Sequence, residues 1–579
     1  MTGSALTAAA LIAAAVATVA IGAYGVRLSR TTSDFLVASR SVGPQWNAAA
    51  ISGEYLSAAS FLGVAGLIAK YGADALWYPV GFTAGYLGLL LFVAAPLRRS
   101  GAYTVPDFAE FRLGSARLRK VAMLVVVVIC VFYLVPQYQG AGLALKTLLG
   151  VPVWIGPLVV GAIVVTNVVA GGMRSITFVQ AFQYWLKLTA IAIPALALLA
   201  LFFADRGELG GPLPPTVGQP TTVAIETDVV VQVDRPAGLT VTGTLDGDSV
   251  QAQPMPSAGE HTLGAGSTLS LAAGAATPVV AGAPSTGTDW IASGGGLGGG
   301  HPLYQVLSII VATFLGTMGL PHVLVRFYTN PDGRAARRTA LAVIALLSLF
   351  YLFPTLLGVF SRLYVPRLLI TGNADAAVLL APGSAVGGLA GQLLGALVAA
   401  GAIAAFLATS SGLLVSIAGA LSTDVLRGRV RDFRIAALVG GLIPIPLSLA
   451  TSGGLELSRS VGLAFAVAAS TLCPLLVLGI WWRGLTALGA GCGLVVGGLL
   501  SGSAVTLAVT GAIDEDALGG WPAVMIGYPA AVSVPVAFAT MILASRMTRT
   551  SAPADVAQIF ARMHVPERLG MGVERVPRG

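Results

Sequence analysis

Apolar residues form long runs along most of this chain, separated by short polar stretches. Each of thirteen such runs approaches the ~20 residues that an α-helix needs to cross the hydrocarbon core of a bilayer. The runs do not show the short alternating segments of a membrane β-barrel. The pattern therefore predicts an all-α polytopic membrane protein with transmembrane helices at 6–26, 45–70, 74–95, 121–146, 151–171, 178–203, 303–325, 338–362, 386–421, 432–451, 459–481, 485–510 and 522–545.

One long polar segment, residues 204–302, interrupts this series and contains nine acidic and two basic residues. Its stretches TTVAIETDVVVQVD and GLTVTGTL alternate Thr and Val in the manner of short strands, and it ends in the glycine-rich SGGGLGGGHP. We predict a small, β-rich extracellular insertion that is either peripheral or a lid or partner-docking module. The predicted parts are helices one to six, the insertion, helices seven to thirteen and a basic tail, at 1–203, 204–302, 303–545 and 546–579.

Charged residues are rare, since 56% of the chain is hydrophobic and 10% is charged, and this excludes an ordinary soluble protein. The net charge of +8 could indicate nucleic-acid binding, but in a membrane protein an excess of Lys and Arg first marks cytoplasmic loops. With the N-terminus outside, 25 of the 33 Lys and Arg lie inside and 7 outside, and Lys187 lies within a helix. We therefore predict an outside N-terminus, a cytoplasmic C-terminus, the lipid bilayer as environment and no nucleic-acid partner.

The three cysteines, Cys130, Cys473 and Cys492, all fall in apolar runs. They are expected to be small buried residues rather than a disulfide framework or a metal site. The first apolar run lacks a basic start and an A-x-A-like cleavage site followed by a soluble domain, so we expect it to be retained.

Three ionisable residues lie within predicted helices, where each is costly unless it faces protein or water. Glu54 lies in the stretch GEYLSAASFLG, Lys187 in the sixth helix and His322 near the inner part of the seventh. Each is a functional candidate. The alternatives are that Glu54 is bonded to a neighbouring helix, and that Lys187 and His322 are satisfied by carbonyls or a carboxylate.

The stretch around Glu54 has a polar face of small residues. Gly53, Leu56, Ser57 and Ser60 share one helical face, because they follow the spacing i, i+3, i+4 and i+7. A glycine in the middle of a helix lowers the cost of unwinding, and unwound turns expose carbonyls that can bind a cation. A close-packed interface of small residues would have the same composition.

The seventh predicted helix contains FLGTMGLPHVLVRFYT, in which Gly316, Gly319 and Pro321 are expected helix breaks. Two interrupted helices five apart run in opposite directions, as in secondary transporters built from inverted repeats.

The ninth predicted helix carries three successive hydroxyl residues, Thr409 to Ser411, and Ala405, Thr409 and Gly412 share a face. Hydroxyl and carbonyl oxygens suit a hard cation, although such side chains also bond back to the carbonyl four residues before.

Taken together, SDFLVASRSVG, GEYLSAASFLGVAG, LRRSGAYTVPDFAEFRL, GGMRSITFVQAFQ and GLPHVLVRFYT resemble the sodium:solute symporters, most closely their acetate permease (monocarboxylate) branch. The resemblance spans about residues 30–545 apart from the insertion. It implies a leucine-transporter-like core of two inverted five-helix repeats, helices two to six and seven to eleven.

The resemblance also implies a cation site, with Na⁺ as a possible ion. Its ligands would be the backbone carbonyls of Gly53, Leu56 and Ala405 and the side chain of Thr409. Sodium-coupled members commonly have a second hydroxyl where this chain has Ala408, and several have aspartate at the position of Gln180. A proton carried on or near Glu54 is therefore a competitor to sodium, and Glu54 and Gln180 are the coupling candidates.

Sugar and proline transporters of the family carry a polar amide at the position of Leu320, so a small and mostly apolar anion suits this chain better. A carboxylate would be held by N–H groups of a half-helix and by Ser57, Ser60 or Thr317. Its methyl group would lie against Leu320 or Phe61.

These features predict a symporter of the bacterial plasma (inner) membrane that takes up acetate, propionate or pyruvate with Na⁺ or H⁺ by alternating access. The sequence contains no GxxxxGK[ST] or HExxH motif, so we expect neither an enzyme nor a primary pump, and no cofactor. A proline- or pantothenate-type symporter, a membrane sensor or scaffold module and a passive channel are the alternatives, and the oligomeric state is left open.

Overall fold

The computed structural model describes residues 3–26, 38, 42–205, 208–298, 300–371, 374–426, 429–451, 455–510, 518–551, 553 and 555–566. Within these residues, eleven helices are long and apolar enough to cross a membrane, and each of the thirteen predicted ranges overlaps one of them. The counts differ because two helical stretches, 59–99 and 155–204, hold parts of two predicted helices each. The first is divided by a 3-10 turn and the second by a kink at Gly172, where φ is 58°. Most of SDFLVASRSVG and the end of the basic tail lie outside the described residues.

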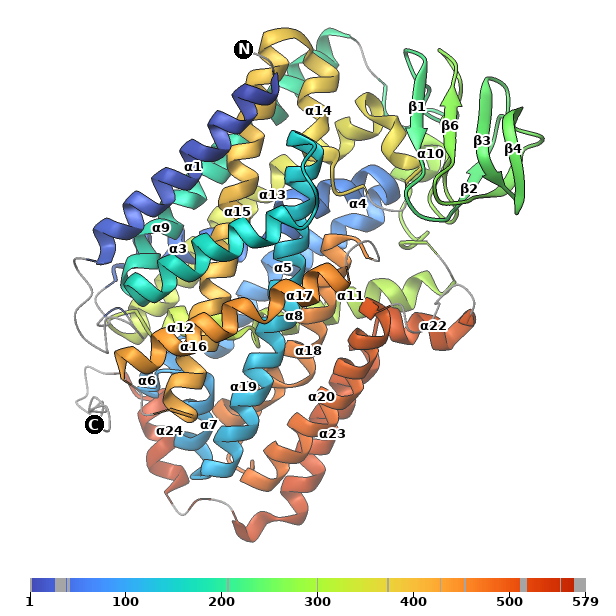
Figure 1. The fold of residues 1–579 in the computed structure, drawn as a ribbon. Helices are drawn as coiled ribbons and strands as arrows, with labels where there is room; N and C mark the ends of the chain where they lie inside the picture. The colour runs from blue at the N-terminus through green and yellow to red at the C-terminus, as the bar shows by residue number, and fades with distance from the viewer. Residues whose placement is uncertain are drawn as a thin grey trace.

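The described part of the chain before the insertion is mostly helical (Figure 1). Its elements are α1 (Gly3–Val26), α3 (Pro44–Tyr55), η2 (Ala59–Gly63), α4 (Val64–Tyr71), η3 (Gly72–Leu76), α5 (Trp77–Gly88), η4 (Leu89–Val93), α6 (Ala94–Arg99), α7 (Val105–Leu113), α8 (Ala116–Leu149) and α9 (Ile155–Ala204).

A second helical series follows the insertion. It comprises α10 (Gly287–Ile291), α11 (Pro302–Thr317), α12 (Pro321–Phe327), α13 (Gly333–Tyr364), η5 (Pro366–Leu369), α14 (Ala377–Val386), α15 (Gly388–Asp424), α16 (Val430–Leu442), α17 (Pro444–Ala450), α18 (Leu457–Ser470), α19 (Leu472–Trp481), α20 (Ala487–Thr510), α22 (Gly520–Gly527), α23 (Ala530–Met547), η6 (Arg549–Ser551) and α24 (Val556–His564).

Helix α15 runs through the middle of the bundle and packs against α1, α8, α9 and α16. Every residue from Val398 to Ala420 is buried. A helix that is buried on all sides needs small residues where neighbouring backbones approach, and this segment is rich in Ala, Gly and Ser. Helices α20 and α23 pack together at one edge of the bundle (Figure 1).

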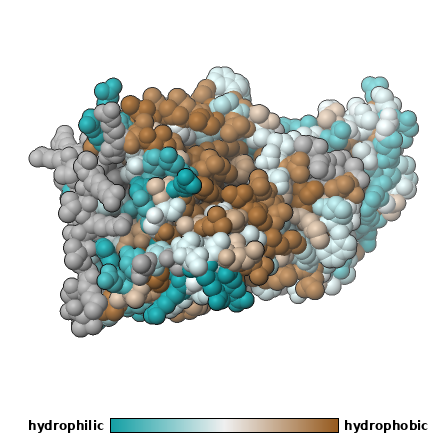
Figure 2. All heavy atoms as spheres, turned by 90° about the horizontal axis from the view of Figure 1, so that it is seen from below, coloured by the Kyte–Doolittle hydropathy of each residue, from teal (hydrophilic) through white to brown (hydrophobic). Residues whose placement is uncertain are grey.

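Large apolar side chains cover much of the outer surface of the bundle. The face in Figure 2 is broadly hydrophobic between more hydrophilic ends. Exposed leucines on α8, α9, α13 and α20 contribute to the apolar surface of the molecule, among them Leu124, Leu196, Leu341, Leu352 and Leu499. Such a surface is expected where lipid, and not water, surrounds the protein.

The insertion contains an antiparallel sheet of seven strands in the order β1-β6-β3-β5-β2-β7, with β4 paired to β3. Val229, Val231 and Val233 point into its small core, as the two-residue period of a strand requires. That core includes Ile370, which follows η5, so the sheet lies against one end of the bundle (Figure 1). The strands are β1 (Thr221–Ala224), β2 (Val229–Val233), β3 (Leu239–Leu245), β4 (Asp248–Pro254), β5 (Gly259–Leu263), β6 (Thr268–Leu271) and β7 (Val279–Val280).

The segment after the sheet docks closely on the bundle. Trp290 of α10 is buried and donates its indole N–H to the Ile68 carbonyl at 2.8 Å. Arg362 lies over the Trp290 ring and donates to the Pro284 carbonyl at 2.8 Å. The Asp74 carboxylate accepts backbone N–H groups from the glycine-rich stretch that follows. The insertion therefore has two parts, an attached sheet and a segment that covers the end of α4.

This division predicts different effects for two changes. Replacing residues 213–282 by a short Gly/Ser linker should leave the melting temperature of the bundle nearly unchanged, because the Thr288 N–H donates to the Gly211 carbonyl at 3.1 Å and keeps the two ends adjacent. Trp290→Ala should cost about 3–5 kcal/mol, as for other buried aromatic truncations. Far-UV circular dichroism of thermal and denaturant unfolding measures both. A large loss of stability on deleting the sheet would contradict the division.

Candidate functional site

The two interrupted helices meet at their broken ends. Helix α3 ends at Tyr55, and Leu56 leaves helical geometry with ψ of 86° before helical structure resumes. Helix α11 ends at Thr317, and α12 begins at Pro321. The Tyr55 hydroxyl lies 2.9 Å from the Thr317 hydroxyl, so the interruptions face each other across the centre of the bundle.

Each break has its own way of satisfying backbone groups. At the first, the side-chain oxygen of Gln137, on α8, accepts a hydrogen bond from the Ala58 N–H at 2.9 Å. At the second, a tight turn satisfies some of its own groups, since the Gly319 N–H donates to the Gly316 carbonyl at 2.7 Å. Gly319 also lies close to α18, because a Cβ on it would be 2.4 Å from the Ala468 carbonyl oxygen. A Cβ on Gly316 would likewise lie 2.5 Å from the Phe465 carbonyl oxygen, so both glycines are needed for packing against α18.

Lys187, on α9, binds the carbonyls of the first break. Its ammonium donates to the carbonyl of Gly53 and, at 2.7 Å, to that of Leu56. The side chain is fully buried. Of the alternatives for Lys187, the structure agrees with satisfaction by carbonyls.

Three of the four predicted cation ligands are therefore engaged with protein groups. The Gly53 and Leu56 carbonyls accept from Lys187, and the Thr409 hydroxyl donates to the Glu54 carbonyl at 2.5 Å. Ala405 is buried one turn before Thr409 on α15. A sodium ion needs several such oxygens directed at it together. Two of the four here already hold an ammonium group, so this arrangement does not fit a free sodium ion.

Glu54 forms a buried ion pair with Arg326 of α12, whose Nε donates to Glu54 Oε2 at 2.6 Å. Both side chains are at most 1% exposed. Arg326 also donates to the hydroxyl of Thr177 at 2.8 Å and to the side-chain oxygen of Gln180, both on α9. The network thus joins α3, α9 and α12, and Glu54 is bonded to a neighbouring helix.

A glycine makes room for this network. A Cβ on Gly412 of α15 would lie 1.9 Å from Glu54 Oε1. The amide of Gln180 donates to the Ala408 carbonyl at 2.8 Å. Gln180 therefore links α9 to α15 through Ala408. Both are positions at which this chain differs from several sodium-coupled members of the family that it resembles.

The predicted substrate residues are all almost fully buried. Ser60 is hydrogen-bonded to the Tyr351 hydroxyl at 2.8 Å, and Thr317 to Tyr55. Phe61 faces the ring of Phe350 at 6.4 Å. These polar groups have partners within the protein, so Ser60 and Thr317 are less available to a solute than the sequence alone suggests.

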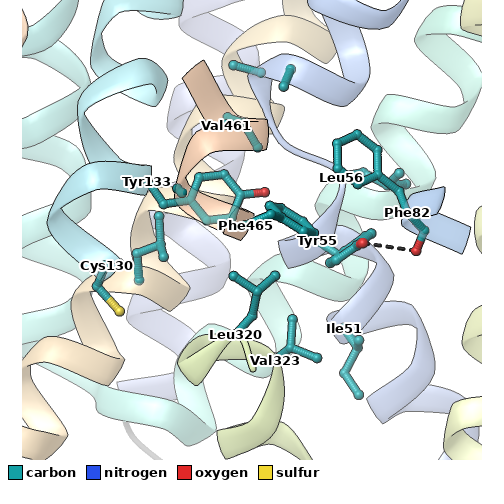
Figure 3. Close-up of a cluster of buried hydrophobic side chains, with 14 of the residues drawn as sticks. Ile51, Tyr55, Leu56, Phe82, Cys130, Tyr133, Leu320, Val323, Val461 and Phe465 are labelled. Atoms are coloured by element: carbon teal, nitrogen blue, oxygen red, sulfur yellow. Dashed lines mark hydrogen bonds between the residues drawn. The ribbon is translucent and has the colours of Figure 1, made fainter. Parts of the chain in front are cut away.

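The surroundings of Ser57 and Leu320 differ from those of the other predicted substrate residues. The buried Ser57 hydroxyl makes no hydrogen bond of ordinary geometry to a described residue, although the Tyr133 hydroxyl is near it. Figure 3 shows Tyr133, Phe465 and Leu320 converging beside the first break. The Tyr133 and Phe465 ring centroids are 5.8 Å apart. The result is a small, largely apolar cluster with a hydroxyl available for a polar group.

Three important residues, Arg326, Gln137 and Tyr133, were not singled out from the sequence. His322 was singled out, but within the part of the chain that the structure describes it lacks the carbonyl or carboxylate partner considered for it. Arg326 was counted as part of the positive charge on the inside, and Gln137 was not considered, although a polar amide inside a helix is itself a signal. Tyr133 lies in an apolar run that gives no such signal. Both ring nitrogens of His322 are buried without a hydrogen-bond partner among the described residues, and its ring packs edge-on against Tyr133 at 5.2 Å.

Comparisons with known proteins agree on one family. Residues 35–204 and 280–497 match the model of the Sodium:solute symporter family, and the gap between these ranges contains most of the sheet. The chain is 30% identical over 573 residues to the monocarboxylic acid transporter of Corynebacterium glutamicum, covering 95% of this chain and 93% of that one. It is 29% identical over 573 residues to the uncharacterized symporter YwcA of Bacillus subtilis, covering 96% and 97%.

A solved structure of a Na⁺-coupled sialic acid symporter resembles the chain with a TM-score of 0.60 at 14% identity, covering 94% of this chain and 98% of that one. At this identity the likeness concerns the fold alone. The family resemblance and the leucine-transporter-like fold predicted from the sequence are confirmed.

The buried pair predicts a strong energetic coupling. Glu54→Gln or Arg326→Met alone should cost about 3–5 kcal/mol, because each leaves a buried charge without its partner. The double variant should lose clearly less than the sum of the two single losses. Denaturant unfolding of the detergent-solubilised protein measures all three free energies of unfolding.

The exposed pair of Lys146 and Glu226, at 2.6 Å, provides the matched control. Glu226→Gln should change the free energy of unfolding by less than about 1 kcal/mol. Additive losses for Glu54→Gln and Arg326→Met would contradict a coupled pair.

Proposed function

Because the chain belongs to the sodium:solute symporter family, we propose that it takes up a short-chain monocarboxylate, such as acetate, propionate or pyruvate, together with a monovalent cation. The observation that carries this proposal is the small apolar cluster of Tyr133, Phe465 and Leu320 at the facing helix breaks, with the Ser57 hydroxyl near that of Tyr133. We place the protein in the bacterial plasma (inner) membrane, where a cation gradient would drive uptake.

The chemistry of the cluster supports a small acid. A carboxylate needs hydrogen-bond donors, and the Ser57 and Tyr133 hydroxyls can supply two of them beside the first break. The remainder of the solute would meet Leu320 and Phe465, which offer only apolar contact. Sugars and amino acids would leave further polar groups without partners in such a site, and that loss is costly. The relative in Corynebacterium glutamicum that bears the name monocarboxylic acid transporter favours the same class.

Enclosure of the site supports alternating access rather than a channel. Ser57, Leu320 and Thr317 are fully buried, so a solute can enter or leave only when helices move. With the predicted orientation, the sheet and Trp290 lie outside and the Glu54–Arg326 pair lies on the cytoplasmic side of the breaks. Separation of α3 from α12 would then open the cytoplasmic path, and the pair would close it again.

Uptake by proteoliposomes tests the function. Radiolabelled acetate, propionate and pyruvate should accumulate when sodium and proton gradients are both imposed, and the accumulation should collapse with ionophores. Excess proline or pantothenate should not compete. Competition by proline or pantothenate would favour that type of symporter, flux that ignores ionophores would favour a channel, and absence of any uptake would favour a sensor or scaffold.

The Ser57 hydroxyl provides the sharpest variant. A hydrogen bond to a charged group contributes about 1.5–3 kcal/mol, so Ser57→Ala should raise the half-saturating substrate concentration by about tenfold or more. Ser501→Ala is the matched control, because Ser501 is equally buried but bonds to the Gly497 carbonyl of its own helix, α20, at 2.6 Å. Equal substrate affinity of the two variants would remove Ser57 from the site.

A further inference from the structure

Lys187 occupies the position that a free cation would take at the first helix break. Its ammonium group contacts the carbonyls of Gly53 and Leu56, which are two of the ligands expected for sodium. An ammonium group carries three N–H donors and one positive charge, so it supplies both the charge and the bonds that these oxygens require. The side chain is fully buried.

The surrounding charges agree with this role. Glu54 and Arg326 form one neutral pair at 2.6 Å, and a protonated Lys187 adds a single positive charge beside it. A sodium ion at the same carbonyls would place a second uncompensated positive charge in a buried region. Like charges repel strongly at such distances where water is excluded, so sodium and the Lys187 ammonium exclude each other.

Two neighbouring positions on α15, the expected ligand Thr409 and the adjacent Ala408, point the same way. The Thr409 hydroxyl donates its hydrogen to the Glu54 carbonyl at 2.5 Å. Ala408 replaces the hydroxyl residue that sodium-coupled members commonly have, and its carbonyl accepts from the Gln180 amide. The oxygens of this region are therefore bonded to one another and to Lys187.

We propose that Lys187 is a built-in cation that takes the place of sodium at the Gly53–Leu56 carbonyls, so that this site binds no free sodium unless Lys187 is removed. This inference deepens the proposed function, on which its transport readout rests. Its binding readout needs no solute. Of the two coupling cations considered for the symporter, sodium has no place at these oxygens.

Sodium titrations of thermal stability test the inference. NaCl replaces choline chloride in steps at constant ionic strength, and the melting temperature of the purified protein is recorded. The wild-type protein should show no saturable shift. Lys187→Ala removes the ammonium and leaves the carbonyls open, so its melting temperature should rise with sodium and reach a plateau. Lys187→Met fills the same space without a charge or a vacancy and should show no shift.

Lys70→Ala is the matched control. Lys70 is also buried and pairs with Glu456 at 2.8 Å, away from the helix breaks, so its removal should create no sodium response. If Lys187→Ala does not purify as a folded protein, Lys187→Ser replaces it with the same expectation. In proteoliposomes, sodium should stimulate uptake by a folded Lys187→Ala or Lys187→Ser variant and leave wild-type uptake unchanged.

A saturable sodium-dependent stabilisation of the wild-type protein would overturn the inference, and so would a folded Lys187→Ala or Lys187→Ser variant that ignores sodium. Failure of the proposed function is recognised separately. If no short-chain acid is transported but the sodium titrations give the expected pattern, the solute is wrong and the role of Lys187 stands.

Discussion

The structure depends on satisfying backbone groups where two helices are interrupted inside an apolar bundle. In the hydrocarbon region, an N–H or C=O group without a partner costs several kcal/mol, and each break creates several. Gln137 of α8 and Lys187 of α9 supply partners at the first break. The second break relies on tight turns and on close contact with α18. A helix can remain interrupted there only because neighbouring helices bring these groups into place.

The same requirement explains why glycines and charged residues occur together. Gly412 lets Glu54 lie directly against α15, and Gly53 lets α3 approach α9, since a Cβ on Gly53 would be 2.1 Å from the Gln180 carbonyl oxygen. Close approach excludes water, and exclusion of water makes a charge tolerable only when its partner is fixed. Glu54 and Arg326 are therefore consequences of tight packing.

Local features of the fold could be predicted, because glycine, proline and hydrophobic length act locally. The interruptions fall in the stretches that contain Gly53 and Pro321, and the apolar runs overlap the observed helices. The helix count differed because helical structure continues through the turn at Gly72–Leu76 and the kink at Gly172, so each of two helical stretches holds parts of two predicted helices. Which side chains meet at the site could not be predicted from the sequence. Arg326 is 272 residues from Glu54, and Lys187 is 131 from Leu56, so only the folded chain brings these pairs together.

An ammonium group on a side chain cannot leave the protein, whereas a free ion can. A free sodium ion at a helix break links the arrangement of that break to the ion concentration, because binding stabilises the state that holds it. Lys187 stabilises the same carbonyls at every sodium concentration. Helix α9 is then bonded directly to the break that it supports. The first break can therefore be as well formed before a solute arrives as it is afterwards.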